Sequence, residues 1–273
     1  MKRNNKGECR QKKIFISSFA EDSLKVAKKY NFGIEINHTC ISDNLDLEKR
    51  EDVLSWIEND LKKAGIALEA EPDCRRYILH GPFTDISPSA IDSRALKLTY
   101  ERMIASIEIA KTLFVDKVIL HTGFFPFLFY PDWHREKSIT FWKRIDKYIP
   151  KGMTICVENV FEENPILFAD IFHEVASDRI KLCMDIGHAH CMSSPDWSVQ
   201  RWIEYLGKDI AHFHLHNNFG ENKDLHQPIM EGSMDIVKVL DAIDKFCGSE
   251  VTMTIESKQA ESSAEFLKEY YGL

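Results

Sequence analysis

Short apolar runs alternate with longer amphipathic segments along nearly the whole chain, and this alternation restricts the possible folds more than any single motif. Eight runs have the length and apolar content of buried strands, at residues 14–18, 32–37, 77–81, 117–121, 154–158, 181–185, 210–215 and 251–256. Eight strand–helix units in 273 residues predict an α/β fold made of one (β/α)8 barrel. An open doubly wound sheet is the alternative, but no GxGxxG phosphate turn supports it.

The segments between the runs carry helical patterns. Apolar residues at Met103, Ile107, Ala110 and Phe114 follow at spacings of four, three and four, which predicts a helix with a core-facing stripe. Further helices are expected at residues 46–64, around 199–206 and 236–243, and at the C-terminus as far as Tyr271. Residues 66–69 fit either a connection or an additional strand.

The N-terminal segment and the composition set the domain organisation and the compartment. Residues 1–13 are basic and no apolar stretch follows them, so we expect a disordered tail before a barrel domain at 14–273. Seven cysteines without repeated close spacing argue against a disulfide framework, and no run reaches the roughly 18 apolar residues of a membrane helix. A net charge of −8 shows no general attraction to nucleic acid or anionic membrane. These features predict a reduced, cytoplasmic protein with no membrane partner.

Reactive side chains stand at the C-terminal ends of six predicted strands. They are His80, His121, Glu158, Asp185, His214 and Glu256. Barrel enzymes build their active sites at this end, so these residues should converge although they are dispersed in sequence. The loops after the sixth and seventh strands add His188, Asp224 and His226. A cluster of imidazoles and carboxylates is costly to bury without partners, and a metal ion is the usual partner.

The segment around His214 is the densest part of this pattern. His212, His214 and His216 lie two apart and would share one face of a strand. His212 lies deeper along the strand and is expected to pack rather than to bind an ion. Of the remaining histidines, we expect His38, His134 and His173 on the surface and His190 beside the site. Glu35 could serve as an acceptor inside the barrel, and Lys258 as an exposed cation near Glu256.

These motifs resemble the xylose-isomerase-like TIM-barrel superfamily, which unites sugar and sugar-phosphate isomerases or epimerases with endonuclease IV of AP endonuclease family 2. The resemblance runs from about residue 14 to residue 256. The motifs that carry it are HGPFTDISP at His80, VILHTG at His121, VENV at Glu158, MDIGHAH around Asp185, HLHNNFGENKDLH from His214 and TIES at Glu256.

The resemblance implies two ligand sets. In the epimerases one divalent ion is held by the residues that match Glu158, Asp185, His214 and Glu256 here. In the endonuclease three zinc ions are held by these four and by five more, which match His80, His121, His188, Asp224 and His226. All nine are present. The epimerases often carry an arginine shortly after the seventh-strand histidine, whereas this chain has His216, Asn217 and Asn218.

The resemblance therefore implies an enzyme, with two candidate reactions. The leading expectation is an isomerase or epimerase of a sugar or sugar phosphate, with one ion of zinc, manganese, iron, magnesium or cobalt. Glu158 and Glu256 would move the proton and His188 would steady a substrate oxygen. The alternative is a zinc phosphodiesterase like endonuclease IV, with two or three ions and nucleic acid as a partner. A barrel that only binds is a third reading, against which the complete ligand set argues.

The aromatic loop at residues 124–133, GFFPFLFYPDWH in context, has no assigned role. It could stack on a base or a sugar ring, or pack on its neighbours or on a second subunit in a homo-oligomer.

Overall fold

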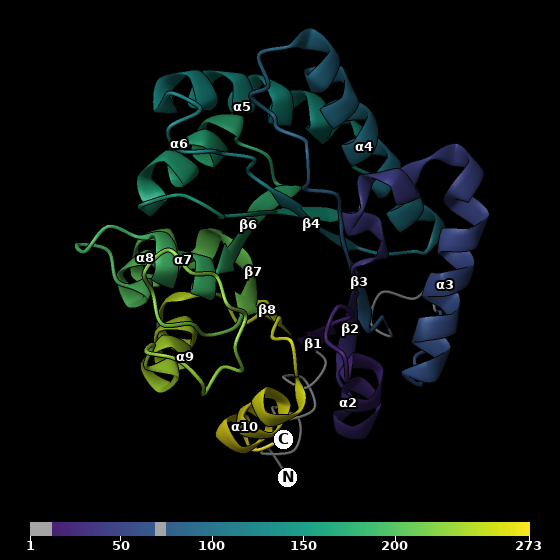
Figure 1. Cartoon of the computed structure of the whole chain (residues 1–273), viewed down its shortest axis with the longest axis vertical. Helices are drawn as coiled ribbons and strands as arrows, with labels where there is room; N and C mark the ends of the chain where they lie inside the picture. Colours follow the sequence, from purple (N-terminus) through teal and green to yellow (C-terminus); the bar gives the residue numbers. More distant parts are fainter. Residues whose placement is uncertain (1–12, 69–74) are drawn as a thin grey trace.

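Eight parallel strands form the centre of the computed structural model, which describes residues 13–68 and 75–273 (Figure 1). Each strand pairs with the next and β8 pairs with β1, so the sheet closes into a barrel. The strands are β1 (Ile14–Ser17), β2 (Gly33–Ile36), β3 (Tyr77–His80), β4 (Lys117–His121), β5 (Thr154–Glu158), β6 (Ile180–Asp185), β7 (Ile210–Leu215) and β8 (Thr252–Ile255). All eight lie where the sequence predicts a strand, and the (β/α)8 barrel is confirmed.

Helices between the strands surround the barrel and cover its outer surface (Figure 1). They are α2 (Ser23–Tyr30), α3 (Arg50–Lys63), α4 (Ser93–Thr112), α5 (Pro131–Ile145), α6 (Pro165–Val175), α7 (Ile186–Met192), α8 (Val199–Leu206), α9 (Ile236–Phe246) and α10 (Glu261–Tyr271). Short 3-10 helices are η1 (His38–Cys40), η2 (Ser42–Leu45), η3 (Leu47–Lys49), η5 (Asp146–Tyr148) and η6 (Gly207–Asp209). Several α-helices begin at a capping side chain; the Asp92 carboxylate, for example, accepts the backbone N–H groups of Arg94 and Ala95 at the start of α4.

Three local expectations need correction, and one open alternative is decided over residues 66–68. The predicted helix at 46–64 is shorter, because η2 and η3 occupy residues 42–49 and α3 begins at Arg50. Phe114 lies beyond the end of α4 with a positive φ of 56° and is half exposed, so it does not belong to the core stripe. The chain also forms α6 and α7, which the periodicity did not predict. Residues 66–68 form no strand, and residue 69 lies outside the described part.

The barrel interior is built in two layers that decide where the site lies. Inward-facing Phe15, Ile78, Ile119, Cys156 and Cys183 form a small apolar cluster, separate from the large core between barrel and helices. Successive inward-facing residues of a strand are two apart. The next inward positions are therefore Ser17, His80, His121, Glu158 and Asp185. The strand-end polar groups thus lie directly above a packed apolar floor.

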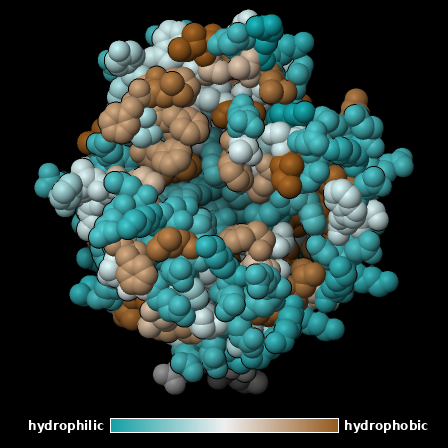
Figure 2. Space-filling model, in the orientation of Figure 1, coloured by the Kyte–Doolittle hydropathy of each residue, from teal (hydrophilic) through white to brown (hydrophobic). Residues whose placement is uncertain are grey.

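The same view in space-filling form is hollowed over the centre of the barrel (Figure 2). Hydrophilic surface lines the hollow, and hydrophobic patches stand around it. Among the described residues, no helix is long and apolar enough to cross a membrane.

The predicted tail at 1–13 lies outside the described residues except for Lys13, whose ammonium donates to the Ser249 carbonyl at 2.6 Å. The five cysteines within 13–68 and 75–273 are free thiols.

Candidate metal centre

The nine ligand candidates predicted from the sequence come together at the C-terminal ends of the strands. They form overlapping groups whose donor atoms lie within 4.8 Å of one another; three groups contain all nine, and a further set, Glu35, His80, His214 and Glu256, overlaps two of these. The first group is His80, His121 and Glu158; the central group is Glu158, Asp185, His214 and Glu256; the outer group is His188, His216, Asp224 and His226. Glu158 belongs to two groups, and His216 is a member that was not predicted from the sequence.

The first group joins the ends of β3, β4 and β5. The Nε2 atoms of His80 and His121 lie 3.4 and 3.3 Å from Glu158 Oε2. His80 Nδ1 lies 2.9 Å from the Gly81 carbonyl and must donate to it, because a carbonyl only accepts. Phe83 stacks on the His121 ring with centroids 4.6 Å apart and covers one side of this group.

The central group surrounds His214, which is fully buried. Its Nδ1 lies 2.9 Å from Glu256 Oε2, 3.3 Å from Glu158 Oε2 and 3.8 Å from Asp185 Oδ2. Its Nε2 lies 3.1 Å from the buried carboxylate of Glu35 on β2, on the opposite side of the ring. Neither of these two atoms has a hydrogen-bond partner among the described residues, so their contact is an ion-pair contact only. Glu35 is an interior acceptor for a different group, because its other carboxylate oxygen accepts from the Thr254 hydroxyl.

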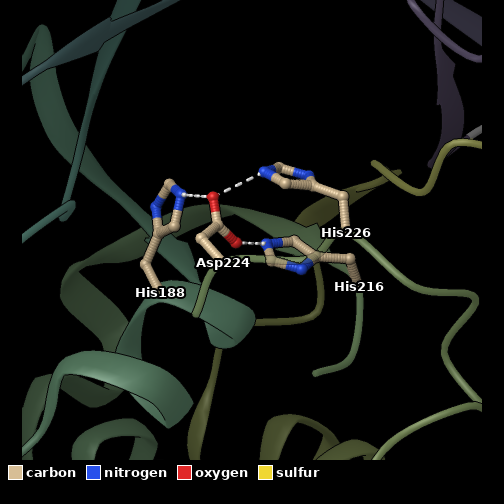
Figure 3. Close-up of side chains that lie close together, drawn as sticks. All are labelled: His188, His216, Asp224 and His226. Carbon is tan, nitrogen blue, oxygen red and sulfur yellow. Dashed lines mark hydrogen bonds and ion pairs between the residues drawn. The ribbon is translucent and has the colours of Figure 1, made fainter. Parts of the chain in front are cut away.

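The outer group is assembled by two loops and the first turn of α7. His188 Nε2 and His226 Nε2 lie 3.3 and 2.8 Å from Asp224 Oδ2. Their Nδ1 atoms face backbone carbonyls, that of Asn159 at 2.9 Å and that of Glu256 at 2.7 Å. Figure 3 shows Asp224 between the rings of His188 and His226. Asp185 starts α7 by accepting the backbone N–H of His188 at 2.6 Å, so one carboxylate belongs to the central group and also positions the outer one.

The tautomers of three histidines indicate what these groups can hold. In His80, His188 and His226, Nδ1–H donates to a backbone carbonyl, so Nε2 of the neutral ring presents a lone pair. Each of these lone pairs faces a carboxylate oxygen. Two acceptors are stable at such distances only with a proton or a cation between them. Neutral imidazole and carboxylate are also the ligands that zinc and related divalent ions prefer.

Buried atoms without partners fit the same conclusion. Among the described residues, Glu158 Oε2, His214 Nδ1 and His216 Nδ1 are buried and have no hydrogen-bond partner. Glu158 Oε2 and His214 Nδ1 approach each other at 3.3 Å but lack the alignment of a hydrogen bond. Unsatisfied buried polar atoms are rare and costly, and a cation between Glu158 and His214 would satisfy both. The donor sets present here therefore fit divalent ions.

The charges of these groups depend strongly on one another in the metal-free protein. Burial opposes ionisation of Glu158, but the positive charges of His214 and His121 lower its pKa well below the ordinary value. Burial also opposes protonation of His226, yet hydrogen bonding to Asp224 and the nearby Glu256 charge raise its pKa to about 9. The pKa of Asp224 is lowered although burial acts against this, because His188 and His226 hydrogen-bond to it. Protons thus occupy the positions that cations would take.

Other residues of interest fall outside the three groups. His212 packs below the site, with its nitrogens 2.6 and 3.0 Å from the hydroxyls of Thr252 and Thr254, as predicted from the sequence. His190 approaches the Ser233 hydroxyl at 2.8 Å on an exposed side of α7, and Lys258 is exposed. His173 is exposed as expected, whereas His38 is partly buried beside Asp60.

His134 corrects a prediction. It was expected on the surface, but it is buried on α5 between the hydroxyls of Ser89 and Ser138. Burial lowers its pKa to about 4, so this histidine is neutral.

Two site residues were missed from the sequence. Asn159 holds the end of β6, since its amide oxygen accepts from the Asp185 backbone N–H at 2.9 Å and its carbonyl faces His188. His216 follows His214 by two residues; the sequence placed it on one strand face with His214 but not among the ligand candidates.

The aromatic loop leaves several large side chains in solvent. Phe127, Leu128 and Tyr130 are largely exposed, and Phe125 packs against Phe161 with centroids 5.3 Å apart. Its stacking on a base or a sugar ring, or its packing on a second subunit, remains a prediction.

The fold and the site together define a (β/α)8 barrel with a candidate metal centre at the C-terminal ends of its strands. The chain belongs to the xylose isomerase-like TIM barrel family, whose model matches residues 28–270. The resemblance noted from the motifs is thereby confirmed. A relative from Methanocaldococcus jannaschii, the uncharacterized protein MJ1311, is 30% identical over 205 residues, which cover 71% of this chain and 69% of the relative.

Solved structures share the fold. A D-tagatose 3-epimerase-like protein is 26% identical with a TM-score of 0.73, covering 95% of this chain and 97% of that one. The TTHB071 protein from Thermus thermophilus, soaked with zinc chloride, is 19% identical with a TM-score of 0.71, over 95% and 98% of the two chains. A family 2 AP endonuclease from Brucella melitensis is 15% identical with a TM-score of 0.66, over 94% and 98%. The last two likenesses show the fold alone. The neighbours include sugar epimerases and AP endonuclease family 2 members.

Proposed function

We propose that the protein is a multinuclear, divalent-metal-dependent hydrolase of phosphate esters. The observation that carries this proposal is the presence of three adjacent donor groups, of which the first and central groups share Glu158. A single-ion isomerase needs only the central group. Five ligand candidates would then be surplus, although each is held by specific contacts: His80, His121, His188, Asp224 and His226.

The contacts of the Glu158 carboxylate also support the proposal. Its Oε2 faces the nitrogens of His80, His121 and His214, and its Oε1 lies 3.3 Å from His188 Nδ1. Among rings that present a free lone pair, Glu158 faces those of the first and central groups, and it would be a shared ligand of ions in these two groups. When bound, neighbouring divalent ions supply positive charge for a phosphate and Lewis-acid activation of water.

The chain's own contribution is to hold these donors in place. The carbonyls of Gly81, Asn159 and Glu256 fix the tautomers of His80, His188 and His226, so each ring presents Nε2 to the site. Glu35 places a buried carboxylate 3.1 Å from His214 Nε2 within the barrel, without a hydrogen bond between them. Preorganised donors lose little freedom when they bind an ion or a substrate.

Metal content and phosphodiester cleavage test the proposal together. Protein purified without chelator should contain two or three divalent ions per chain by elemental mass spectrometry. It should hydrolyse bis(p-nitrophenyl) phosphate or an abasic-site DNA duplex. Asp224→Asn, which removes a donor of the outer group only, should lose about one ion and most of the hydrolysis. One ion per chain in the parent, without hydrolysis of either substrate, would contradict the proposal.

An isomerase or epimerase of a sugar or sugar phosphate is the second candidate. The central group favours it, since Glu158 and Glu256 both face His214 and His188 lies beside Glu158. The D-tagatose 3-epimerase-like protein at 26% identity supports it too. Here Glu158 and Glu256 would transfer the proton next to a carbonyl, with His188 holding a substrate oxygen. Solvent deuterium incorporated at a sugar carbon beside a carbonyl, with one ion bound, would favour this reaction.

A further inference from the structure

His216 is buried at the boundary between the central and outer groups. It lies just beyond β7, two residues after His214, and is fully buried. Its Nε2 lies 3.0 and 3.1 Å from the two oxygens of Asp185 and 3.7 Å from Asp224 Oδ1. The contact with Asp185 is the closer one, and it is a hydrogen bond that His216 donates to a carboxylate of the central group.

The surroundings of His216 are shaped to admit its ring. A Cβ atom on Gly187 would overlap the His216 ring, so only glycine fits at this position in the first turn of α7. The side chain of Asn218 donates to the Gly187 carbonyl at 2.8 Å and fixes this turn against the loop after β7. On its other face, the His216 ring stacks on His226 with centroids 3.9 Å apart and planes 15° apart (Figure 3).

The stacking excludes His216 as a second ligand of an ion on His226. An ion bound to imidazole lies in the plane of the ring, about 2.0–2.1 Å from its nitrogen. Two nearly parallel rings stacked at 3.9 Å share no such point. His216 lies near the donors of the outer group, but its ring lies in a plane nearly parallel to that of His226. Its Nε2 proton is directed to Asp185.

We propose that His216 is a positioning residue that joins the central and outer groups. Its Nε2–H holds Asp185, and its ring supports His226 by stacking. The outer group would then hold an ion through three protein ligands, His188, Asp224 and His226, the number that catalytic zinc sites provide. The role in the outer group rests on the proposed multinuclear function, whereas the hold on Asp185 applies to any ion in the central group.

Zinc affinity of the full-length, chelator-stripped protein tests this inference. We expect His216→Ala to weaken binding by about 10–100-fold, the usual effect of losing a partner of a ligand. His216→Asn retains an amide donor toward Asp185 and should recover part of that loss. Gly187→Ala removes no polar atom but displaces the ring, and it should weaken binding in the same direction. His173→Ala removes an exposed histidine paired with Asp209 and is the control that should match the parent.

Cobalt absorption spectra separate positioning from ligation. If His216 acts through Asp185 and His226, His216→Ala should reach the parent's ligand-field spectrum at higher cobalt concentration. A changed spectrum of His216→Ala at cobalt saturation would show that His216 is a ligand. An unchanged zinc affinity of this variant would show that His216 does not position the ligands. Either result overturns the inference. If the parent protein binds only one ion, the multinuclear function is refuted. Weaker zinc binding by His216→Ala would still support the role of His216 in holding Asp185. Circular dichroism confirms that each variant is folded.

Discussion

Glu158→Gln is the substitution that most sharply perturbs the proposed centre, because this carboxylate serves two groups. Without its charge, the first group retains only His80 and His121, and the central group retains three of four donors. The outer group keeps every ligand. We therefore expect loss of the first ion, weaker binding of the central ion and an intact outer ion.

The size of the effect follows from linkage between binding and folding. An ion present at about one hundred times its Kd stabilises the folded state by about 2.7 kcal/mol. At about 2.1 cal/mol/K per residue, 273 residues give an unfolding entropy of roughly 0.6 kcal/mol/K. Each ion should thus raise Tm by about 5 °C, and three ions by about 14 °C. Glu158→Gln should keep between one third and two thirds of the parent's rise.

Differential scanning fluorimetry with and without zinc measures this rise in parent and variant. The difference between the two conditions removes the effect of the substitution on the metal-free protein. Asp170→Asn, which changes a carboxylate on the outer helix α6, is the matched control and should keep the full rise. A Glu158→Gln variant whose Tm rises as much as that of the parent would refute the bridging position of this residue.

Three further outcomes are expected. Asp224→Asn should lower bound zinc by about one ion per chain in elemental analysis. An unchanged zinc content would show that the outer group binds no ion. The raised pKa of His226 contributes stability below pH 6.5 that is lost as pH rises toward about 9. Urea unfolding of metal-free protein should show this loss, and His226→Gln should reduce it. Asp92→Ala removes the α4 cap and should cost about 1 kcal/mol in urea unfolding, without changing metal content.

The strands and the strand-end residues could be predicted because they follow from the local sequence pattern of each strand. Buried parallel strands are continuous apolar runs, and their common direction places every C-terminal end at one face of the barrel. His80 and Glu158 come from different strands, yet both positions follow from these two rules alone. The three-group division also agrees with the ligand sets implied by the motifs.

Helices α6 and α7 were not predicted, for different reasons. The α6 sequence, PILFADIFHEV, is apolar on most sides, so periodicity does not distinguish it from a strand. The α7 sequence spans seven residues and begins directly after Asp185, whose side chain caps it. Its existence depends on a carboxylate that the sequence motifs identified only as a ligand.

His134 and His216 show where tertiary contacts decide. His134 stands in the polar stretch PDWHREKS, and its burial depends on tertiary contacts, including the one between α5 and the distant Ser89. The place of His216 depends on the missing Cβ of Gly187 and on the loop that returns His226 to the site. Neither neighbour is close in sequence, so no periodic pattern identifies these contacts.

An anomalous-scattering map from a zinc-soaked crystal is the most direct test of the multinuclear centre, because it counts the ions and identifies their ligands. We predict three peaks. One should lie among His80, His121 and Glu158, one beside His214, and one between Asp224 and the rings of His188 and His226. A single peak beside His214, at saturating zinc, would contradict the multinuclear centre and favour the isomerase.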